Sequence, residues 1–248
     1  MVWLIREDIK NNYINTVKQA INDDYTFSDF KNNLFYLSVV GMSDDKQAEI
    51  WLNKIRECPD IFSKLDVFSR NDIIGNPSLW TSSDGITISP NTLHYINTLR
   101  EISESFEFEG PINVLELGVG YGGLCYILSN FYNINSYCLV DLPDVQTFAA
   151  KYLSKLGVNN LTFEPTMTTD LFISEYCLSE FDDTQMDTFY EQYIVESMYI
   201  YLLMNLHDKN RRELFLNKLS NHFCISVSDE FPKPNYPNFV VKGVNYKN

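Results

Sequence analysis

The feature that most constrains this chain is a glycine-rich turn directly after an apolar segment. Residues Ile112–Leu117 have the composition of a buried strand, and they run into Gly118-Val119-Gly120-Tyr121-Gly122-Gly123 ahead of an apolar, helix-like stretch. A glycine turn at this place lets the main chain approach a ligand closely and offers free amides at a helix start. We therefore predict a ligand-binding turn here, with a tight turn that binds nothing as the alternative.

The acid before this turn indicates which ligand to expect. Dinucleotides and S-adenosylmethionine (SAM) both bind turns of this kind, and the dinucleotide fingerprint G-x-G-x-x-G faces an anionic pyrophosphate. Glu116 stands two positions before the first glycine, where a carboxylate suits the sulfonium and amino groups of SAM. The turn resembles motif I of class I SAM-dependent methyltransferases. That resemblance implies a cofactor site at Glu116, Gly118, Gly120, Tyr121, Gly122 and Gly123.

A second acid fits the same cofactor. Asp141 ends the next expected strand, where a carboxylate can accept hydrogen bonds from both ribose hydroxyls. NAD sites share this spacing, and a helix cap before Leu142-Pro143 is the alternative role for Asp141. We place Leu142 and Glu175 in the cofactor site as well.

Strand-like and helix-like segments alternate from about residue 111 onward. Seven strands are expected at Ile112–Leu117, Tyr137–Asp141, Leu161–Glu164, Leu171–Tyr176, Tyr199–Met204, Cys224–Val227 and Phe239–Val241. Helices are expected between them at Gly122–Phe131, Val145–Leu156, Thr184–Ser197 and Lys209–Leu219. This alternation predicts an α/β fold, a Rossmann-like seven-stranded methyltransferase sheet that is mostly parallel with an antiparallel last strand.

The preceding residues have helical periodicity, so we predict a helical N-terminal region at 1–105 and a SAM-binding domain at 106–248. Apolar residues recur at helical spacing in three groups: Ile9, Tyr13, Val17 and Ile21; Phe30, Leu34, Leu37 and Val40; Ala48, Trp51, Leu52 and Ile55. Ser28 and Gly41 are expected to bound the second helix, and Ser89-Pro90 to start a helix that runs to about Ser105. The region is expected either to close over the acceptor or to form a homodimer interface.

Several segments resemble the sugar O-methyltransferase family found in polysaccharide-biosynthesis loci. They are Gly75-Asn76-Pro77, Ser89–Tyr95, Glu116–Gly123, Asp141-Leu142-Pro143 and Asp170–Glu180, within roughly residues 70 to 245. His94 stands where that family usually has Arg, and Ser174-Glu175-Tyr176 where it usually has Ser-Asn-Tyr. The resemblance implies methyl transfer to a hydroxyl of a sugar or nucleotide-sugar acceptor.

An alcohol acceptor is a weak nucleophile and needs a general base at the carboxyl ends of the fourth or fifth strand. Tyr176, Glu180 and His207 are the expected catalytic residues. Each also has a plainer role: a core aromatic, a solvated helix-start carboxylate and an exposed loop histidine. For His94 we favour packing on the Ser89–Ser105 helix, and Asn205 and Glu230 are weaker candidates.

Charge and cysteine content restrict the partners. The formal net charge is -14, which disfavours nucleic acid as a substrate. The five cysteines are scattered without CxxC spacing, which argues against zinc and for a reducing, cytoplasmic location. No apolar run is long enough to span a membrane. The acids Asp182, Asp183 and Asp187 suit a helix start, so we expect no metal.

Three alternatives remain at this stage. The chain could methylate another small acceptor, such as an amine or a carboxylate. It could be an NAD-dependent oxidoreductase, which Glu116 argues against. It could also be a non-catalytic partner with a SAM-binding fold.

Overall fold

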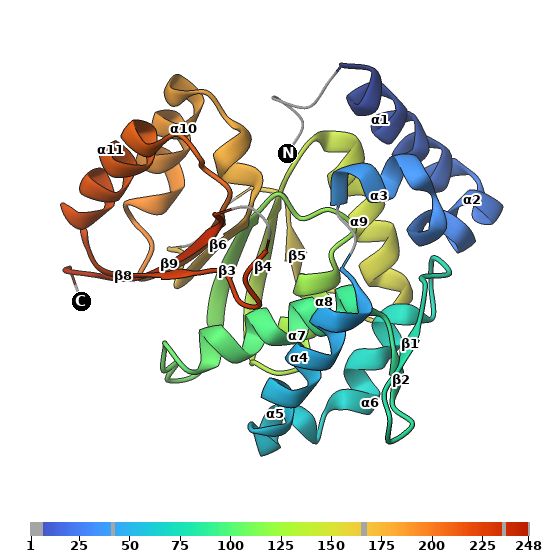
Figure 1. Cartoon of the computed structure of the whole chain (residues 1–248). Helices are drawn as coiled ribbons and strands as arrows, with labels where there is room; N and C mark the ends of the chain where they lie inside the picture. The colour runs from blue at the N-terminus through green and yellow to red at the C-terminus, as the bar shows by residue number, and fades with distance from the viewer. Residues whose placement is uncertain (1–6, 41–42, 165–167, 235–236, 248) are drawn as a thin grey trace.

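The computed structural model describes residues 7–40, 43–164, 168–234 and 237–247, and it contains one large sheet covered by helices on both faces (Figure 1). The sheet order is β5-β4-β3-β6-β7-β9-β8. Its strands are β3 Ile112–Leu117, β4 Ile134–Val140, β5 Leu161–Thr162, β6 Leu171–Glu175, β7 Tyr199–Met204, β8 Phe223–Asp229 and β9 Phe239–Asn245. In this sheet β9 pairs antiparallel with β7 and β8, and the other described strand pairs are parallel. The predicted methyltransferase-type sheet is confirmed.

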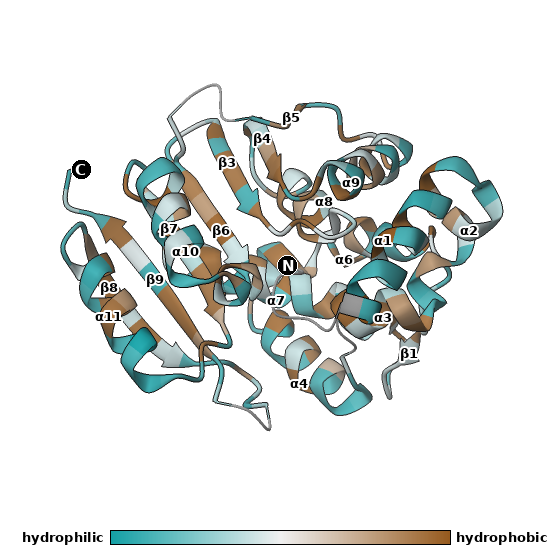
Figure 2. Cartoon of the chain, turned by 90° about the horizontal axis from the view of Figure 1, so that it is seen from above, coloured by the Kyte–Doolittle hydropathy of each residue, from teal (hydrophilic) through white to brown (hydrophobic). Residues whose placement is uncertain are grey.

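The helices divide between the two faces of the sheet. Helices α7 Pro90–Ser103, α8 Gly123–Ser129 and α9 Pro143–Lys155 cover one face, and α10 Asp183–Phe189 and α11 Lys209–Ser220 cover the other (Figure 1). Side chains of a strand alternate between the faces, so Val114 packs with the first group and Leu115 with the second. The central strands are largely brown in the hydropathy view, as expected for strands buried on both faces (Figure 2).

Helices of the N-terminal region pack against the first face. They are α1 Glu7–Asn22, α2 Asp24–Asp29, α3 Leu34–Val40, α4 Asp45–Arg56, α5 Pro59–Phe62 and α6 Leu65–Phe68, with short 3-10 turns at Phe30–Asn32 and Ser69–Asp72. Tyr13, Tyr36 and Trp51 belong to the same hydrophobic core as Phe148 and Tyr152 of α9. The N-terminal helices and the sheet therefore share one core, and α7 covers the sheet itself.

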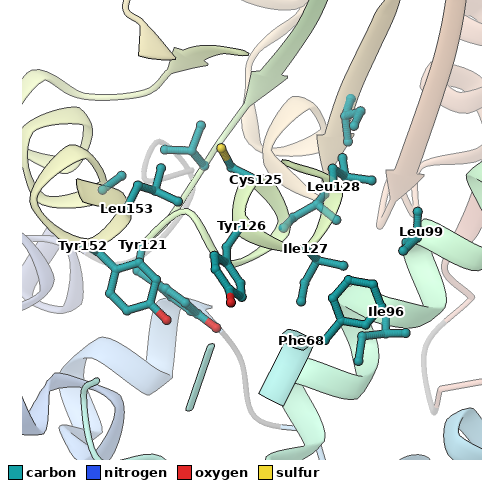
Figure 3. Packing of buried hydrophobic residues seen from close by; sticks show 14 of the residues in the cluster. Phe68, Ile96, Leu99, Tyr121, Cys125, Tyr126, Ile127, Leu128, Tyr152 and Leu153 are labelled. Atoms are coloured by element: carbon teal, nitrogen blue, oxygen red, sulfur yellow. The ribbon is translucent and has the colours of Figure 1, made fainter. Parts of the chain in front are cut away.

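Part of this shared core lies where the turn Gly118–Gly123 meets the helices. Figure 3 shows Ile127 of α8 facing Phe68 and Ile96, and Tyr121 beside Tyr152. The rings of Tyr121 and Tyr152 meet edge to face at 4.9 Å. Such packing holds the turn between β3 and α8 rigidly against the N-terminal region.

Several predicted boundaries were wrong. The second helix is broken into the 3-10 turn Phe30–Asn32 and α3, because Asn33 is extended and its side chain caps α3 by accepting from the amides of Phe35 and Tyr36. Ser28 lies inside α2 and caps nothing, and Gly41 lies outside the described residues.

Other differences concern length. The predicted helix Thr184–Ser197 is α10 followed by a π-helical turn, Tyr190–Ile194. The loop before α7 contains a small hairpin, β1 Trp80–Thr81 and β2 Thr87–Ile88. Ser89 does cap α7, accepting from the Thr92 amide at 3.1 Å.

Across the described residues, no helix has the length and apolar character needed to cross a membrane.

Candidate active site

A pocket opens at the carboxyl ends of β3 and β6, the edge where ligands bind in sheets of this kind. It encloses about 820 Å³, its open mouth included. Four parts of the chain line it: the N-terminal helices, α7, the ends of β3 and β6, and the connection between β8 and β9. The lining residues are Val40, Ser43, Gln47, Trp51, Asn91, His94, Tyr95, Glu116, Gly118, Val119, Gly120, Glu175, Tyr176, Glu230, Pro234 and Asn238.

The glycine turn after β3, Gly118–Gly123, forms one wall of this pocket. Because it is predicted to bind the methyl donor, it is called the donor turn. Gly118 has φ +86°, and a Cβ there would lie 2.3 Å from Cβ of Cys177, so only glycine lets the turn pass the start of the segment after β6. Gly120 lines the pocket directly. Gly122 and Gly123 are also required by packing: a Cβ on either would strike packed side chains, Leu153 for the first and Tyr95 and Tyr121 for the second. Close packing therefore accounts for three of the four glycines without a ligand, and Gly120 is the exception.

The Tyr121 side chain points away from the pocket. Its hydroxyl accepts a 3.0 Å hydrogen bond from the Asn71 side chain, and its ring lies 4.3 Å from Nζ of the buried Lys31. The side chain of Tyr121 therefore does not line this pocket, and its predicted cofactor contact would be made by its main chain.

Glu116 is buried at the pocket's floor. It occupies the position of β3 that faces α7–α9, and its Oε2 accepts a 2.7 Å hydrogen bond from the Tyr137 hydroxyl of β4. Burial raises the pKa of the Glu116 carboxyl well above its usual value, although the bond from Tyr137 acts in the opposite direction. A cation beside Glu116 would act against this shift, because it stabilises the ionised carboxylate.

Asp141 lies just beyond β4 and faces the same turn. Its Oδ1 accepts from the Leu142 amide at 2.7 Å and its Oδ2 from the Gly120 amide at 3.4 Å. Burial is the main cause of a raised Asp141 pKa. Asp141 and Leu142 line a second, mostly apolar cavity of about 530 Å³. The other residues of this cavity are Leu117, Val140, Pro143, Cys177, Phe181, Gln185 and Phe189.

Glu175, at the end of β6, is held by two side chains of α7. Its Oε1 accepts a 2.5 Å hydrogen bond from the Thr98 hydroxyl, and its Oε2 lies 3.3 Å from Nε2 of His94. Burial alone would lower the pKa of the His94 imidazole, but the surrounding carboxylates, Glu175 foremost, together outweigh burial and the pKa is raised. We expected His94 to be a packing residue; the structure places it in the pocket, paired with a carboxylate.

Tyr176 begins a second set of polar contacts on the opposite wall. It has a positive φ of +62°, and its hydroxyl donates a 2.6 Å hydrogen bond to Oε1 of Glu230. Asn238 donates to the other oxygen of Glu230 at 2.8 Å and contacts Nε2 of the exposed His207 at 3.2 Å. His207 thus contacts Asn238 of the pocket but is not itself among the lining residues. A non-glycine residue in this backbone region is uncommon and clusters at functional sites.

Glu180 lies away from the two polar walls. It ends the short 3-10 turn Cys177–Glu180, and burial raises its pKa to about 7. Asp141 and Tyr13 are within its electrostatic reach, whereas Glu175 and His94 are not among the groups that perturb it. The structure therefore brings Glu180 to the Asp141 side of the site and does not bring it into the pocket with Tyr176.

The remaining polar candidates have structural partners. The backbone N–H of Asn205 donates to the Ser179 hydroxyl at 3.1 Å. Asp182 caps α10, Asp183 pairs with Arg211 at 2.7 Å, and Asp187 pairs with Lys218 at 2.8 Å. Among the described residues there is no group of three or more His, Cys, Asp or Glu side chains arranged to hold a metal ion.

Sequence reasoning undervalued the residues that α7 brings to the pocket. His94 and Thr98 are four positions apart on one helix and therefore share a face, a spacing visible in the sequence. Their common partner, Glu175, is 77 positions from Thr98, and no local pattern joins the two. Trp51 was predicted only as part of a helical apolar pattern; its indole nitrogen donates to the Phe231 carbonyl at 3.1 Å, so it links α4 to the β8–β9 connection.

Comparisons with known proteins give distant structural similarity. No protein-family model matches this chain, and no curated protein matches it. Among solved structures, it is similar to a SAM-dependent methyltransferase from Aquifex aeolicus, with 14% identity over 61% of this chain and 89% of the other and a TM-score of 0.46. An rRNA methylase from Streptococcus thermophilus is 13% identical over 60% of this chain and 95% of the other, with a TM-score of 0.45. The S-adenosylhomocysteine complex of M. capricolum TrmK is 13% identical over 60% of this chain and 68% of the other, with a TM-score of 0.45. Similarity this distant says nothing about the acceptor, which has to be inferred from the pocket's own residues.

Proposed function

We propose that this protein is a SAM-dependent O-methyltransferase that acts on a hydroxyl of an uncharged sugar or similar polyhydroxylated acceptor. One observation carries the proposal. The turn that follows β3, with Glu116 at its base, opens into the same pocket as the His94–Glu175 pair. A methyl donor and a general base are thereby brought to one place, which is what the reaction requires.

The donor half fits SAM residue by residue. The carboxylate of Asp141 would accept from the ribose hydroxyls, and the apolar cavity beside Leu142 would take the adenine ring. The turn Gly118–Gly120 would meet the methionine portion, with the carboxylate of Glu116 near its amino group. Bound SAM supplies a methyl group activated by a positively charged sulfur.

The chain's own residues would position the acceptor and remove its proton. When Nε2–H of His94 donates to Glu175, Nδ1 keeps a lone pair and can accept the proton of the acceptor hydroxyl. A new oxygen–carbon bond forms as the sulfur–carbon bond breaks, so the products are the methyl ether and S-adenosylhomocysteine. Glu175 then stabilises the imidazolium that has formed. We prefer His94 to His207 and Glu180 as the base because it lines the pocket.

Charge in the pocket supports an uncharged acceptor. Its described lining contains three carboxylates, Glu116, Glu175 and Glu230, and includes neither Lys nor Arg. A phosphate near these carboxylates would be repelled, which disfavours RNA and the diphosphate of a nucleotide sugar at this position. Hydroxyl groups can donate to carboxylates and to the amide oxygens of Asn91 and Asn238.

The same acids favour one second candidate, methyl transfer to an amine. A protonated amine would be attracted by Glu175 and Glu230, and His94 could deprotonate it before transfer. The two functions differ in the atom that is methylated and in the charge of the acceptor, so a single set of acceptors can separate them.

Two experiments test the proposal in order. Calorimetric titration of the purified protein with SAM and with NADH should show binding of SAM alone; binding of NADH without SAM would reject the proposal. Methyl transfer from radiolabelled SAM is then measured on a neutral glycoside, its phosphate ester and its amino analogue. The neutral glycoside should be methylated fastest, whereas preference for the amino analogue would favour the second candidate.

A further inference from the structure

Tyr36 is a buried tyrosine of the N-terminal region that lies against the donor turn. It belongs to α3 and is 1% exposed. Its ring packs edge to face on Phe30 at 5.0 Å and on Phe148 at 6.0 Å, and it lies 5.5 Å from the ring of Tyr13. The ring is therefore fixed by neighbours on three elements, and the direction of its hydroxyl is fixed with it.

The Tyr36 hydroxyl is buried and has no hydrogen-bond partner in the described part of the chain. A buried polar group in this state costs about 1–3 kcal/mol. The neighbouring buried tyrosines differ: Tyr121 accepts from Asn71 and Tyr152 donates to it. A phenylalanine would fill the same space without the cost, so the hydroxyl calls for a partner that the chain itself does not supply.

The direction of the hydroxyl identifies where that partner would be. Its oxygen lies 4.0 Å from the point where a Cβ on Gly120 would stand, so it faces the turn across the space that a side chain would fill. Burial raises the Tyr36 pKa well above its usual value, and the nearby Asp141 is among the contributing charges. The phenol therefore stays protonated and can act as a hydrogen-bond donor beside Gly120 and Asp141.

We propose that the hydroxyl of Tyr36 donates a hydrogen bond to an oxygen atom of bound SAM, which makes α3 a wall of the donor site. This inference rests on the proposed function, since it assumes that the turn binds SAM. SAM offers two kinds of acceptor oxygen near Gly120, those of its carboxylate and those of its ribose. In either case the N-terminal region contributes directly to donor binding.

The variant Tyr36→Phe tests this, with Tyr132→Phe as a matched control. Tyr132 also has a buried hydroxyl without a described partner, but its ring packs on Phe108 and Phe131, away from the donor turn. Affinity for SAM and for S-adenosylhomocysteine is measured by calorimetry, and thermal unfolding is followed without ligand. Tyr36→Phe should weaken SAM binding roughly tenfold. Neither variant should unfold at a lower temperature than the wild type, and Tyr132→Phe should bind SAM normally.

Binding of 5′-methylthioadenosine, which has the ribose but lacks the amino-acid carboxylate, separates the two acceptor oxygens. If Tyr36→Phe binds both 5′-methylthioadenosine and S-adenosylhomocysteine more weakly than the wild type does, the acceptor is a ribose oxygen. If only the affinity for S-adenosylhomocysteine falls, the acceptor is the carboxylate. Unchanged affinity for both would overturn the inference, as would a lower unfolding temperature of Tyr36→Phe without ligand. If the wild type binds no SAM, the proposed function fails, and the inference fails with it; unchanged binding by the variant alone leaves the proposed function intact.

Discussion

Nε2 of His94, on α7, lies 3.3 Å from Oε2 of Glu175 at the end of β6. Since the Thr98 hydroxyl holds the other oxygen of Glu175, the carboxylate cannot easily rotate away from the imidazole. The pair therefore connects α7, which precedes β3 in the chain, to β6, which lies beside β3 in the sheet.

Replacing Glu175 by Gln should lower the pKa of His94. The wild-type pKa should lie above 6.5 because the neighbouring carboxylates, Glu175 foremost, together outweigh burial, and burial should dominate once the charge of Glu175 is removed. NMR titration of the imidazole protons measures this directly, and the chain has only three histidines to assign. Glu230→Gln is the control: Glu230 is a smaller contributor to the same shift, so its removal should move the pKa less. An unchanged pKa in Glu175→Gln would contradict the pairing.

His94→Asn should reduce methyl transfer to an accepted substrate about 10²- to 10⁴-fold, the usual contribution of a general base. SAM affinity should stay near the wild-type value because the donor contacts are on other residues. Wild-type turnover should rise with pH through the pKa of His94, since only the neutral imidazole accepts a proton. His207→Asn, which changes an exposed histidine outside the pocket, serves as the comparison. Equal losses in the two variants would count against His94 as the base.

Asp141→Asn should weaken SAM binding about 10- to 100-fold, because a carboxylate that accepts from two ribose hydroxyls is replaced by a neutral amide. Asp144→Asn makes the same chemical change three residues later, at a position that faces solvent beside Lys18. Calorimetry on both variants measures the difference. Should Asp144→Asn weaken binding as much as Asp141→Asn, the effect would be one of general charge and not of a ribose contact.

Lys31→Met should change how stability depends on pH. Burial lowers the pKa of Lys31 to about 7, so between pH 7 and the unfolded value of 10.5 the unfolded chain binds one proton more than the folded chain does. Wild-type stability should therefore rise relative to Lys31→Met as pH increases above 7, by at most about 1.4 kcal/mol per pH unit. Urea unfolding at pH 6.5 and pH 9 checks the sign. Lys18→Met removes the same charge from a solvent-exposed position and should show no comparable trend.

Gly118→Ala should destabilise the protein more than Gly157→Ala. Both glycines have a positive φ, so both variants should lose about 1 kcal/mol to backbone strain. A Cβ at Gly157 would meet nothing within 4 Å, whereas at Gly118 it would clash with Cys177. Overpacking should add about 1–3 kcal/mol at Gly118, measurable by urea unfolding without ligand. Similar losses for the two variants would mean that the Cys177 segment can move aside.

The sheet could be predicted closely because its information is local. The apolar run Ile112–Leu117 matches β3 at both ends, and Ser89-Pro90 marks the start of α7. Both signals depend on residues a few positions apart. The break before α3 was missed because Asn33, a residue that reads as helix interior in a periodic pattern, instead caps the following helix.

The residues of the candidate site also differ in whether local sequence predicts their positions. Glu116, the glycine turn and Asp141 are carried by the ends of two strands that are consecutive in sequence, so their spacing alone places them together at one edge of a parallel sheet. Sequence alone thus determined the fold class and the proximity of Glu116, the glycine turn and Asp141. It also suggested that all four glycines serve a ligand, whereas Gly118, Gly122 and Gly123 are required by packing against neighbouring side chains.

Only the tertiary structure decided which side chains face the glycine turn and line the rest of the pocket. His94 meets Glu175, Tyr176 meets Glu230, and Tyr36 faces Gly120 across separations of 54 to 84 positions. Contacts of this range depend on how helices pack on the sheet, which is set by the shape of the shared hydrophobic core and leaves no periodic trace in the chain. The glycine turn after β3 was therefore readable from its own residues, while the groups that face it became visible only once the core had brought them there.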